Sequence, residues 1–340
     1  MLILFLYYFL LVISTEDYLT SVTIRDNKLY NIYQDSKLDH VKCRVFELKE
    51  GPIIDIINSS KTYELIQSLK GFNLVFIDTP DSSKESYNKL WVRTKSYLGA
   101  AQQKNTLYAN WIGYINLDDM SLKTDSSFIK FPMFENFPMD RYTINTVTNK
   151  YGSALYITGG VISPNNDRSL LYAKSFYKYN FTSKEWIDMA YSANGKLRHF
   201  IEHRSVVIEN RYLVILGGPP ERSKNELESS NSERSNLIRK SLYNLTVFDT
   251  FSNNWEEVNI KPNILETSIA TLQFNRFLAT VYNNKIIVIG MSVGDDDHFI
   301  VGGSPFMGIL DYNSKTWNWS PIYDEDGSKF NLSISALDLL

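Results

Sequence analysis

Histidine is the residue most often used for proton transfer and metal binding near neutral pH, and this chain contains four. His199 and His203 are four residues apart, which on a helix would place two ligands on one face. The residues after His203 form an apolar run typical of a strand, and same-face residues four apart on a strand lie about 13 Å from each other. The pair therefore predicts no metal site; the remaining histidines are His40 and His298.

Clustered carboxylates are the second group with potential for chemistry. Residues 295–297 are three consecutive aspartates followed by His298, and residues 324–327 read Asp-Glu-Asp-Gly. A calcium-binding loop alternates its acidic residues with other types, and neither segment has that spacing. We expect both to be exposed acidic loops, and we predict no metal and no cofactor.

Two nucleophile types remain. The only cysteine, Cys43, lies in the apolar run 41–46, which indicates a small buried residue and not a reactive thiol. The chain has no G-x-S-x-G sequence, although a Ser-His-Asp set assembled from distant residues would leave no such motif. No catalytic residue is predicted, and we expect a protein that is not an enzyme.

The elements that must position these residues are strands. The clearest unit spans residues 203–258, where short apolar runs alternate with turn residues, as strands do. The second run ends at Gly217-Gly218, and Trp255 follows Phe248 by seven residues.

The same pattern recurs in two further units. Residues 142–189 contain Gly159-Gly160 after the second run, and Tyr179 precedes Trp186 by seven residues. Residues 276–319 contain Gly290 at the glycine position, and Leu310 precedes Trp317 by the same step.

Two earlier units are less regular. Residues 20–57 have Tyr33-Gln34 at the diglycine position, and Ile53 follows Phe46 by seven residues in place of tryptophan. In residues 63–131, we expect strands at 72–77 and 111–115, with Asp78-Thr79 at the diglycine position and a short helix near 98–103.

A hydrophobic strand, a Gly-Gly pair, an aromatic residue and a tryptophan, repeated about every 50 residues, resemble the kelch repeat. The resemblance implies an all-β, kelch-type β-propeller with five recognisable blades, each a four-stranded antiparallel sheet, within a single domain at residues 20–340. A terminal strand at 330–337 either closes the ring or begins a sixth blade. In kelch repeats the glycines allow positive φ, the tryptophans pack between blades, and a histidine placed like His203 makes a structural hydrogen bond.

Three insertions follow the second strand of their units and should project from one face of a propeller: residues 80–107, 161–174 and the polar, flexible 219–240. Kelch propellers serve mostly as interaction modules. The resemblance therefore implies that the protein binds another protein through these loops, although each loop is also compatible with a tolerated insertion that has no role.

The alternative function is a glycan-binding or galactose-oxidase-like propeller, since aromatic faces stack on sugars and the chain has 14% aromatic residues. Galactose oxidase uses copper with a cysteine-linked tyrosine and two histidines. Here Cys43 lies in the first unit, and no histidine pair stands beside suitable tyrosines. A third reading is a decaying paralogue without a ligand, because the second unit is degraded.

The first 14 residues are expected to be a signal peptide, because residues 1–13 are apolar and too short to span a bilayer. A buried first strand and an uncleaved anchor are the other readings, and no second apolar run of membrane length follows. A net charge of −3 without basic blocks argues against nucleic-acid binding. We expect a secreted or cell-surface glycoprotein with candidate N-glycosylation sites at Asn58, Asn180, Asn244, Asn318 and Asn331.

Overall fold

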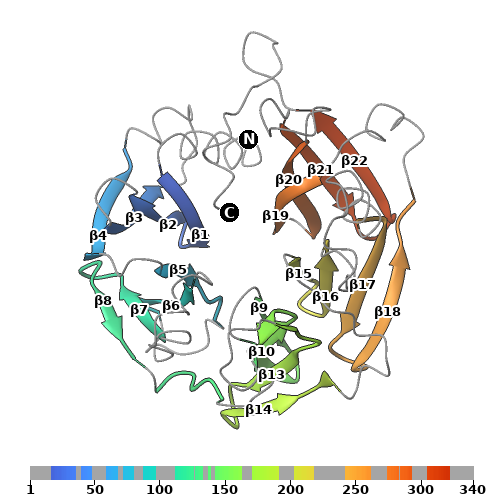
Figure 1. Ribbon diagram of the computed structural model, residues 1–340, viewed down its shortest axis with the longest axis horizontal. Helices are drawn as coiled ribbons and strands as arrows, with labels where there is room; N and C mark the ends of the chain where they lie inside the picture. The colour runs from blue at the N-terminus through green and yellow to red at the C-terminus, as the bar shows by residue number, and fades with distance from the viewer. Residues whose placement is uncertain are drawn as a thin grey trace. The chain divides into compact units, whose positions relative to one another are not determined.

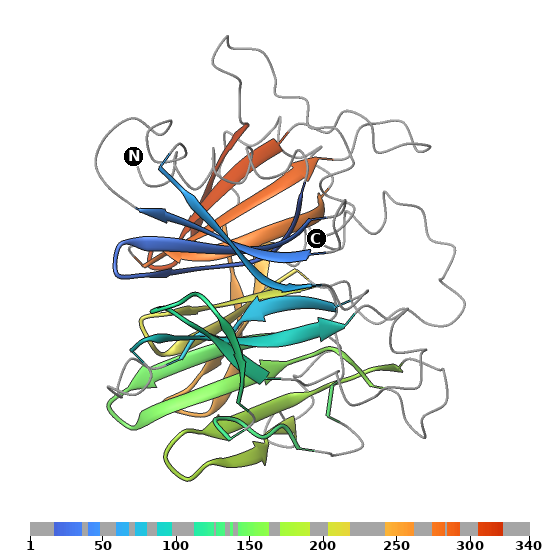
Figure 2. The same cartoon turned by 90° about the vertical axis from the view of Figure 1, so that its left-hand side faces the viewer.

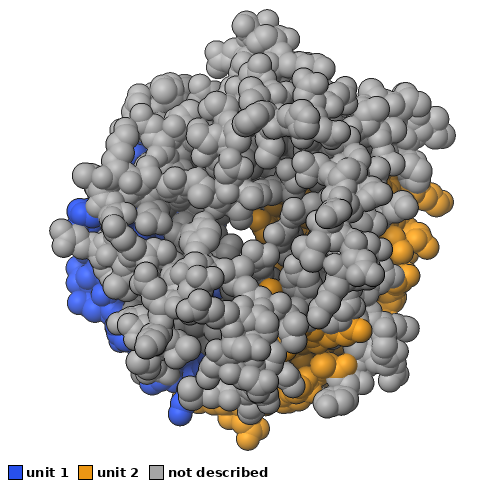
Figure 3. Space-filling view, viewed as in Figure 1, with its two compact units in different colours: residues 1–132, 335–340 blue, residues 133–334 orange. Residues whose placement is uncertain are grey.

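The structure is a computed structural model, and it describes residues 17–35, 40–47, 59–67, 72–79, 87–96, 112–125, 127–132, 137–138, 142–162, 171–190, 203–217, 242–261, 274–282, 284–292 and 305–321. The chain divides into two compact units, which Figure 3 colours separately: residues 1–132 with 335–340, and residues 133–334. Each unit is built from four-stranded antiparallel sheets (Figure 1).

Unit 1 contains two of these sheets. The first consists of β1 (Asp17–Arg25), β2 (Lys28–Asp35), β3 (His40–Glu47) and β4 (Lys61–Gln67). The second consists of β5 (Phe72–Phe76), β6 (Lys89–Ser96), β7 (Ile112–Asn116) and β8 (Leu122–Thr124). Strand β5 lies against β1 and β2, so the two sheets pack through their first strands.

Unit 2 contains three four-stranded sheets. The third sheet consists of β9 (Thr143–Asn149), β10 (Gly152–Thr158), β13 (Phe176–Asn180) and β14 (Glu185–Asp188). The fourth consists of β15 (Arg204–Ile208), β16 (Tyr212–Leu216), β17 (Asn244–Asp249) and β18 (Asn254–Asn259). The fifth consists of β19 (Phe274–Tyr282), β20 (Lys285–Ser292), β21 (Pro305–Asp311) and β22 (Thr316–Pro321). A short ladder joins β11 (Val161–Ile162) to β12 (Leu171–Tyr172).

In each sheet the strands are hydrogen-bonded in chain order, and they are twisted relative to one another (Figure 2). A four-stranded meander of this kind is the blade of a β-propeller. The protein thus has the all-β fold of a five-bladed β-propeller, as predicted from the sequence. The expected terminal strand at 330–337 lies outside the described residues, and the kelch type stays a prediction.

The seven-residue step has a direct structural meaning. Tyr179 pairs with Trp186 across β13 and β14, and Phe248 pairs with Trp255 across β17 and β18. Leu310 pairs with Trp317 across β21 and β22. The predicted equivalence of the three tryptophans is confirmed at the level of strand register.

The turn inside that step is the same in the three sheets. The residue after the aromatic or leucine is Asn180, Asp249 or Asp311, and its side-chain oxygen accepts a hydrogen bond from a backbone N–H two residues on. The residue two before each tryptophan has positive φ: 58° at Lys184, 54° at Asn253 and 54° at Lys315. An Asx cap followed by a left-handed residue therefore fixes the register.

The second sheet has the same turn, which the sequence reading missed because leucine replaces tryptophan. Ile115 pairs with Leu122, the Asn116 side chain accepts the Asp118 N–H, and Met120 has φ of 56°. The apolar pair and the Asx cap were the available signals.

The first sheet departs from the predicted boundaries. Its fourth strand is β4, which pairs Tyr63 with Cys43, so this blade extends past residue 57 and the second blade begins at Phe72 and not at 63. Glutamate follows Phe46 where the other sheets have Asn or Asp, so the tight Asx turn is missing. Ile53, predicted as the tryptophan equivalent, lies outside the described residues.

The predicted surface loop at 80–107 is wrong in part, because it contains β6. Trp91 and Val92 of this strand are buried, and β6 pairs with both β5 and β7. The run predicted as the second strand at 72–77 therefore contains β5, which is the first strand of its sheet. Asp78-Thr79 consequently follow a first strand and do not occupy the diglycine position. The expected helix near 98–103 lies outside the described residues.

Glycine after the second strand has the expected conformation. Gly159, Gly160 and Gly217 have φ of 64°, 106° and 68°, a region that disfavours other residues. Gly290 differs, because it lies inside β20, paired with Phe277 and Phe306. Gly218 is outside the described residues.

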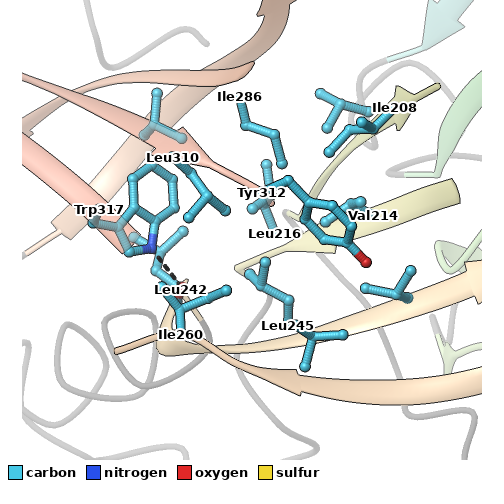
Figure 4. Packing of buried hydrophobic residues seen from close by; sticks show 14 of the residues in the cluster. Ile208, Val214, Leu216, Leu242, Leu245, Ile260, Ile286, Leu310, Tyr312 and Trp317 are labelled. Carbon is cyan, nitrogen blue, oxygen red and sulfur yellow. Dashed lines mark hydrogen bonds between the residues drawn. The ribbon is translucent and has the colours of Figure 1, made fainter. Parts of the chain in front are cut away.

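The core lies between neighbouring sheets of each unit. In unit 2, one apolar cluster joins the fourth and fifth sheets, and a second joins the third and fourth. Trp317 in the first cluster is fully buried and donates its indole N–H to the Leu242 carbonyl oxygen at 2.9 Å (Figure 4). Trp255 in the second contacts Phe176 of the third sheet, with ring centroids 4.8 Å apart. The indoles therefore join adjacent blades, as the repeat implied.

Candidate functional site

Cys43 is a free, fully buried cysteine on β3, as the apolar run predicted. Burial raises the pKa of its thiol to about 12. The thiolate, which is the nucleophile, is therefore scarcely populated at neutral pH.

We expect Cys43 to resist modification by a disulfide reagent such as DTNB at about pH 8 in the folded protein, and to react fully after denaturation. Absorbance of the released thiolate measures the reaction. Rapid stoichiometric modification of protein that keeps its native circular dichroism would contradict the buried position.

His203 lies in a polar network between the third and fourth sheets. It is 1% exposed, and its Nε2 is 3.0 Å from the hydroxyl oxygens of both Thr143 and Thr158. Asn145 Nδ2 donates to Ser205 Oγ, and Ser205 Oγ donates to Thr143 Oγ1. The network ties β9 and β10 to the start of β15, which agrees with the structural hydrogen bond implied for His203.

This network is not a nucleophile–base pair. Burial, and then the charge of Arg204, lowers the pKa of His203 to about 3, so its imidazole is neutral across the physiological range. Ser205 donates its proton to a threonine hydroxyl and makes no bond to the imidazole. These side chains therefore hold two sheets together and supply no general base at neutral pH.

Exposed aromatic side chains gather at the turn ends of unit 2. Tyr151, in the turn between β9 and β10, is 71% exposed, and Phe251, in the turn between β17 and β18, is 36% exposed. Their rings meet edge to face, with centroids 5.3 Å apart and planes at 90°. Two sheets thus place large apolar side chains side by side at the surface.

Two cations lie against these rings. Lys150 Nζ is 5.0 Å from the ring centre of Tyr151 and 5.8 Å from that of Phe251. The Arg211 guanidinium is 4.8 Å from the ring centre of Phe251 and 4.7 Å from that of Tyr212. These distances are those of cation–π contacts, which hold the charged groups at defined positions.

The set extends to the fifth sheet, because the rings of Tyr212 and Tyr312 lie 5.8 Å apart. Tyr312 is buried, and burial together with the charge of Glu256 raises the pKa of its phenol. We call the whole set the aromatic row, which comprises Lys150, Tyr151, Arg211, Tyr212, Phe251 and Tyr312.

A bidentate ion pair fixes the middle of the row. Arg211 Nε and Nη2 donate to the two carboxylate oxygens of Asp249 at 2.8 and 2.6 Å. The same carboxylate accepts the Phe251 N–H and the Ser252 hydroxyl, so these four bonds hold the pKa of Asp249 well below its usual range. The Asx turn that sets the strand register therefore also orients Arg211 and Phe251.

The sequence reading did not find the aromatic row. Its members lie in turns or at strand ends, up to 162 positions apart along the chain, and only the packing of the sheets brings them together. The one signal in the sequence was the presence of aromatic residues at turn positions, where polar residues are usual.

The predicted glycosylation sites have different surroundings. Asn318 on β22 is exposed, whereas Asn180 uses its side-chain oxygen in the turn after β13. The side-chain oxygen of Asn244 is buried. Asn58 and Asn331 lie outside the described residues, and glycosylation stays a prediction.

Several other predictions from the sequence concern residues outside the described ranges: His199, His298, and segments 295–297, 324–327 and 219–240. Within the described ranges, no group of three His, Cys, Asp or Glu residues is placed to hold a metal ion. The same ranges contain no helix with the length and hydropathy needed to cross a membrane.

No protein-family model and no curated protein matches the chain. Solved structures that are similar include the polysaccharide lyase Uly1, at 10% identity and a TM-score of 0.44, covering 90% of this chain and 72% of that one. RS223-β-xylosidase is similar at 9% identity and a TM-score of 0.42, covering 94% and 97%. The β-propeller domain of the Trilobed protease from Pyrococcus furiosus has 10% identity and a TM-score of 0.38, covering 91% and 84%.

These comparisons contradict the expectation that the protein is not an enzyme, because a polysaccharide lyase and a xylosidase are among the similar structures. The absence of a local catalytic motif was a weak basis for that expectation, since propeller loops from distant repeats can assemble a site. At 9–10% identity the likeness concerns the fold and assigns no activity.

Proposed function

We propose that this propeller binds carbohydrate through the aromatic row. The observation that carries the proposal is Tyr151, a 71% exposed aromatic side chain whose ring is held in place by Phe251 and Lys150. Apolar C–H faces of sugars pack against aromatic rings, and neighbouring polar groups then orient the hydroxyl groups.

The row supplies both parts of such a site. Tyr151 offers a ring face and a phenol that donates or accepts a hydrogen bond, and Lys150 offers an ammonium donor beside it. The ion pair of Arg211 with Asp249 orients the second ring, Phe251, through the cation–π contact of Arg211 and the bond from the Phe251 N–H to Asp249. Ordering these side chains before binding reduces the entropy that a ligand must overcome.

Replacement of Tyr151 by alanine is expected to weaken binding of the preferred glycan about tenfold while leaving the fold intact, because truncating an exposed central aromatic commonly costs more than about 1 kcal/mol of binding free energy. A glycan array identifies the ligand, and calorimetric titration gives the ratio. Tyr87→Ala, which removes another exposed tyrosine in the other unit, is the matched control and should bind like the wild type.

Two results would overturn the proposal. One is an array on which the folded wild-type protein binds no carbohydrate. The other is equal affinity of Tyr151→Ala and the wild type for every glycan bound.

A further inference from the structure

The charges of the aromatic row are distributed unevenly. At one end, Lys150 contacts the two rings, and no carboxylate of the described residues lies within ion-pair distance of it. In the middle, the charge of Arg211 is compensated by the bidentate Asp249 carboxylate. Among the described residues, the positive charge of the row that has no carboxylate partner therefore lies beside Tyr151.

The opposite end is negative. Glu209 is exposed, and its side-chain oxygen accepts a hydrogen bond from Asn284 Nδ2 at 3.0 Å. Asn284 also accepts the Glu209 N–H at 3.2 Å, so the adjoining turn of the fifth sheet holds the carboxylate, whose charge acts on Tyr312 at this end of the row. An anionic ligand group is thus favoured at the Tyr151 end and disfavoured at the Glu209 end.

On this basis we infer that the row selects a carbohydrate that bears a carboxylate, a uronic acid residue, with its ring against Tyr151 and its carboxylate against Lys150. The inference rests on the proposed function and specifies its ligand class. The cation–π contacts hold the ammonium over the rings of Tyr151 and Phe251, so a fixed positive charge adjoins the ring against which the sugar would pack. The charge is exposed, so its contribution should depend on salt.

Polygalacturonate and its carboxyl-reduced, neutral derivative are the matched probes, since they share a backbone and differ only in the acid group. We expect the wild type to bind the acid polymer about threefold to fivefold more tightly at low salt, the size of an exposed ion pair. Lys150→Met, which keeps the aliphatic stem but removes the charge, should abolish this preference, so that the acid polymer and the neutral polymer bind with equal affinity. Lys174→Met, an exposed lysine elsewhere in the same unit, should retain it.

The outcomes separate this inference from the proposed function. Three results overturn the inference: equal binding of the two polymers, no binding of either, or an unchanged preference in Lys150→Met. The proposed function still stands after any of these results if another glycan binds in a Tyr151-dependent way. Tighter binding of dextran sulfate than of polygalacturonate also overturns it, because the selected anion is then a sulfate. Loss of Tyr151 dependence for every glycan overturns the function itself.

Discussion

Replacement of Trp317 by alanine is expected to lower the free energy of unfolding by about 3–5 kcal/mol, the usual cost of removing a buried indole. The side chain is fully buried among residues of the fourth and fifth sheets, including Leu216 and Leu310 (Figure 4). Its removal leaves a cavity between two blades and deprives the Leu242 carbonyl of a donor.

Urea denaturation with linear extrapolation measures this loss. Trp186→Ala is the matched control, because Trp186 has the same register in its sheet but is partly exposed, and its loss should be clearly smaller. The loss of stability in Trp317→Phe should be smaller than that in Trp317→Ala, since phenylalanine keeps an apolar ring but removes the hydrogen bond. Equal losses for Trp317→Ala and Trp186→Ala would contradict the packing described for Trp317.

The second large effect is expected from acid. The pKa of His203 is about 3 in the folded protein and about 6.5 in the unfolded chain. Above pH 6.5 both states are neutral at this residue, so it has no pH-dependent effect. As the pH falls below that value, only the unfolded chain takes up the proton, and stability declines by about 1.4 kcal/mol per pH unit until the folded protein titrates.

At about pH 4.5 this residue alone should reduce the free energy of unfolding by about 2–3 kcal/mol. His203→Gln keeps an amide that can bond to Thr143 and Thr158 but does not titrate. Its stability should therefore fall less steeply between pH 6.5 and 4, while the carboxylates contribute equally to both proteins. Parallel pH profiles of the two proteins would show that His203 is not buried in its neutral form.

The sequence predicted the parts of the fold that depend on local chemistry. Tyr179, Phe248 and Leu310 each precede a tryptophan by seven residues because an Asx-capped turn places those residues opposite each other. The first sheet could not be read in this way, since Glu47 stands where the other sheets have an Asn or Asp cap and β4 begins only at Lys61.

The candidate site depends on packing between sheets, which no local period records. Tyr151 and Phe251 are 100 positions apart and meet only because the third and fourth sheets pack through a shared core. His203 was correctly assigned to a structural hydrogen bond, but its threonine partners in β9 and β10 were not predicted. Both cases show that turns and strand register were readable from the sequence, whereas the individual side-chain partners across neighbouring blades were not.

The most direct test of carbohydrate binding by the aromatic row is a crystal structure of the full chain with the glycan selected on the array. We expect a sugar ring stacked on Tyr151 at the turns after β9 and β17, within reach of Lys150. A bound sugar that contacts none of Tyr151, Phe251 and Lys150 would contradict it.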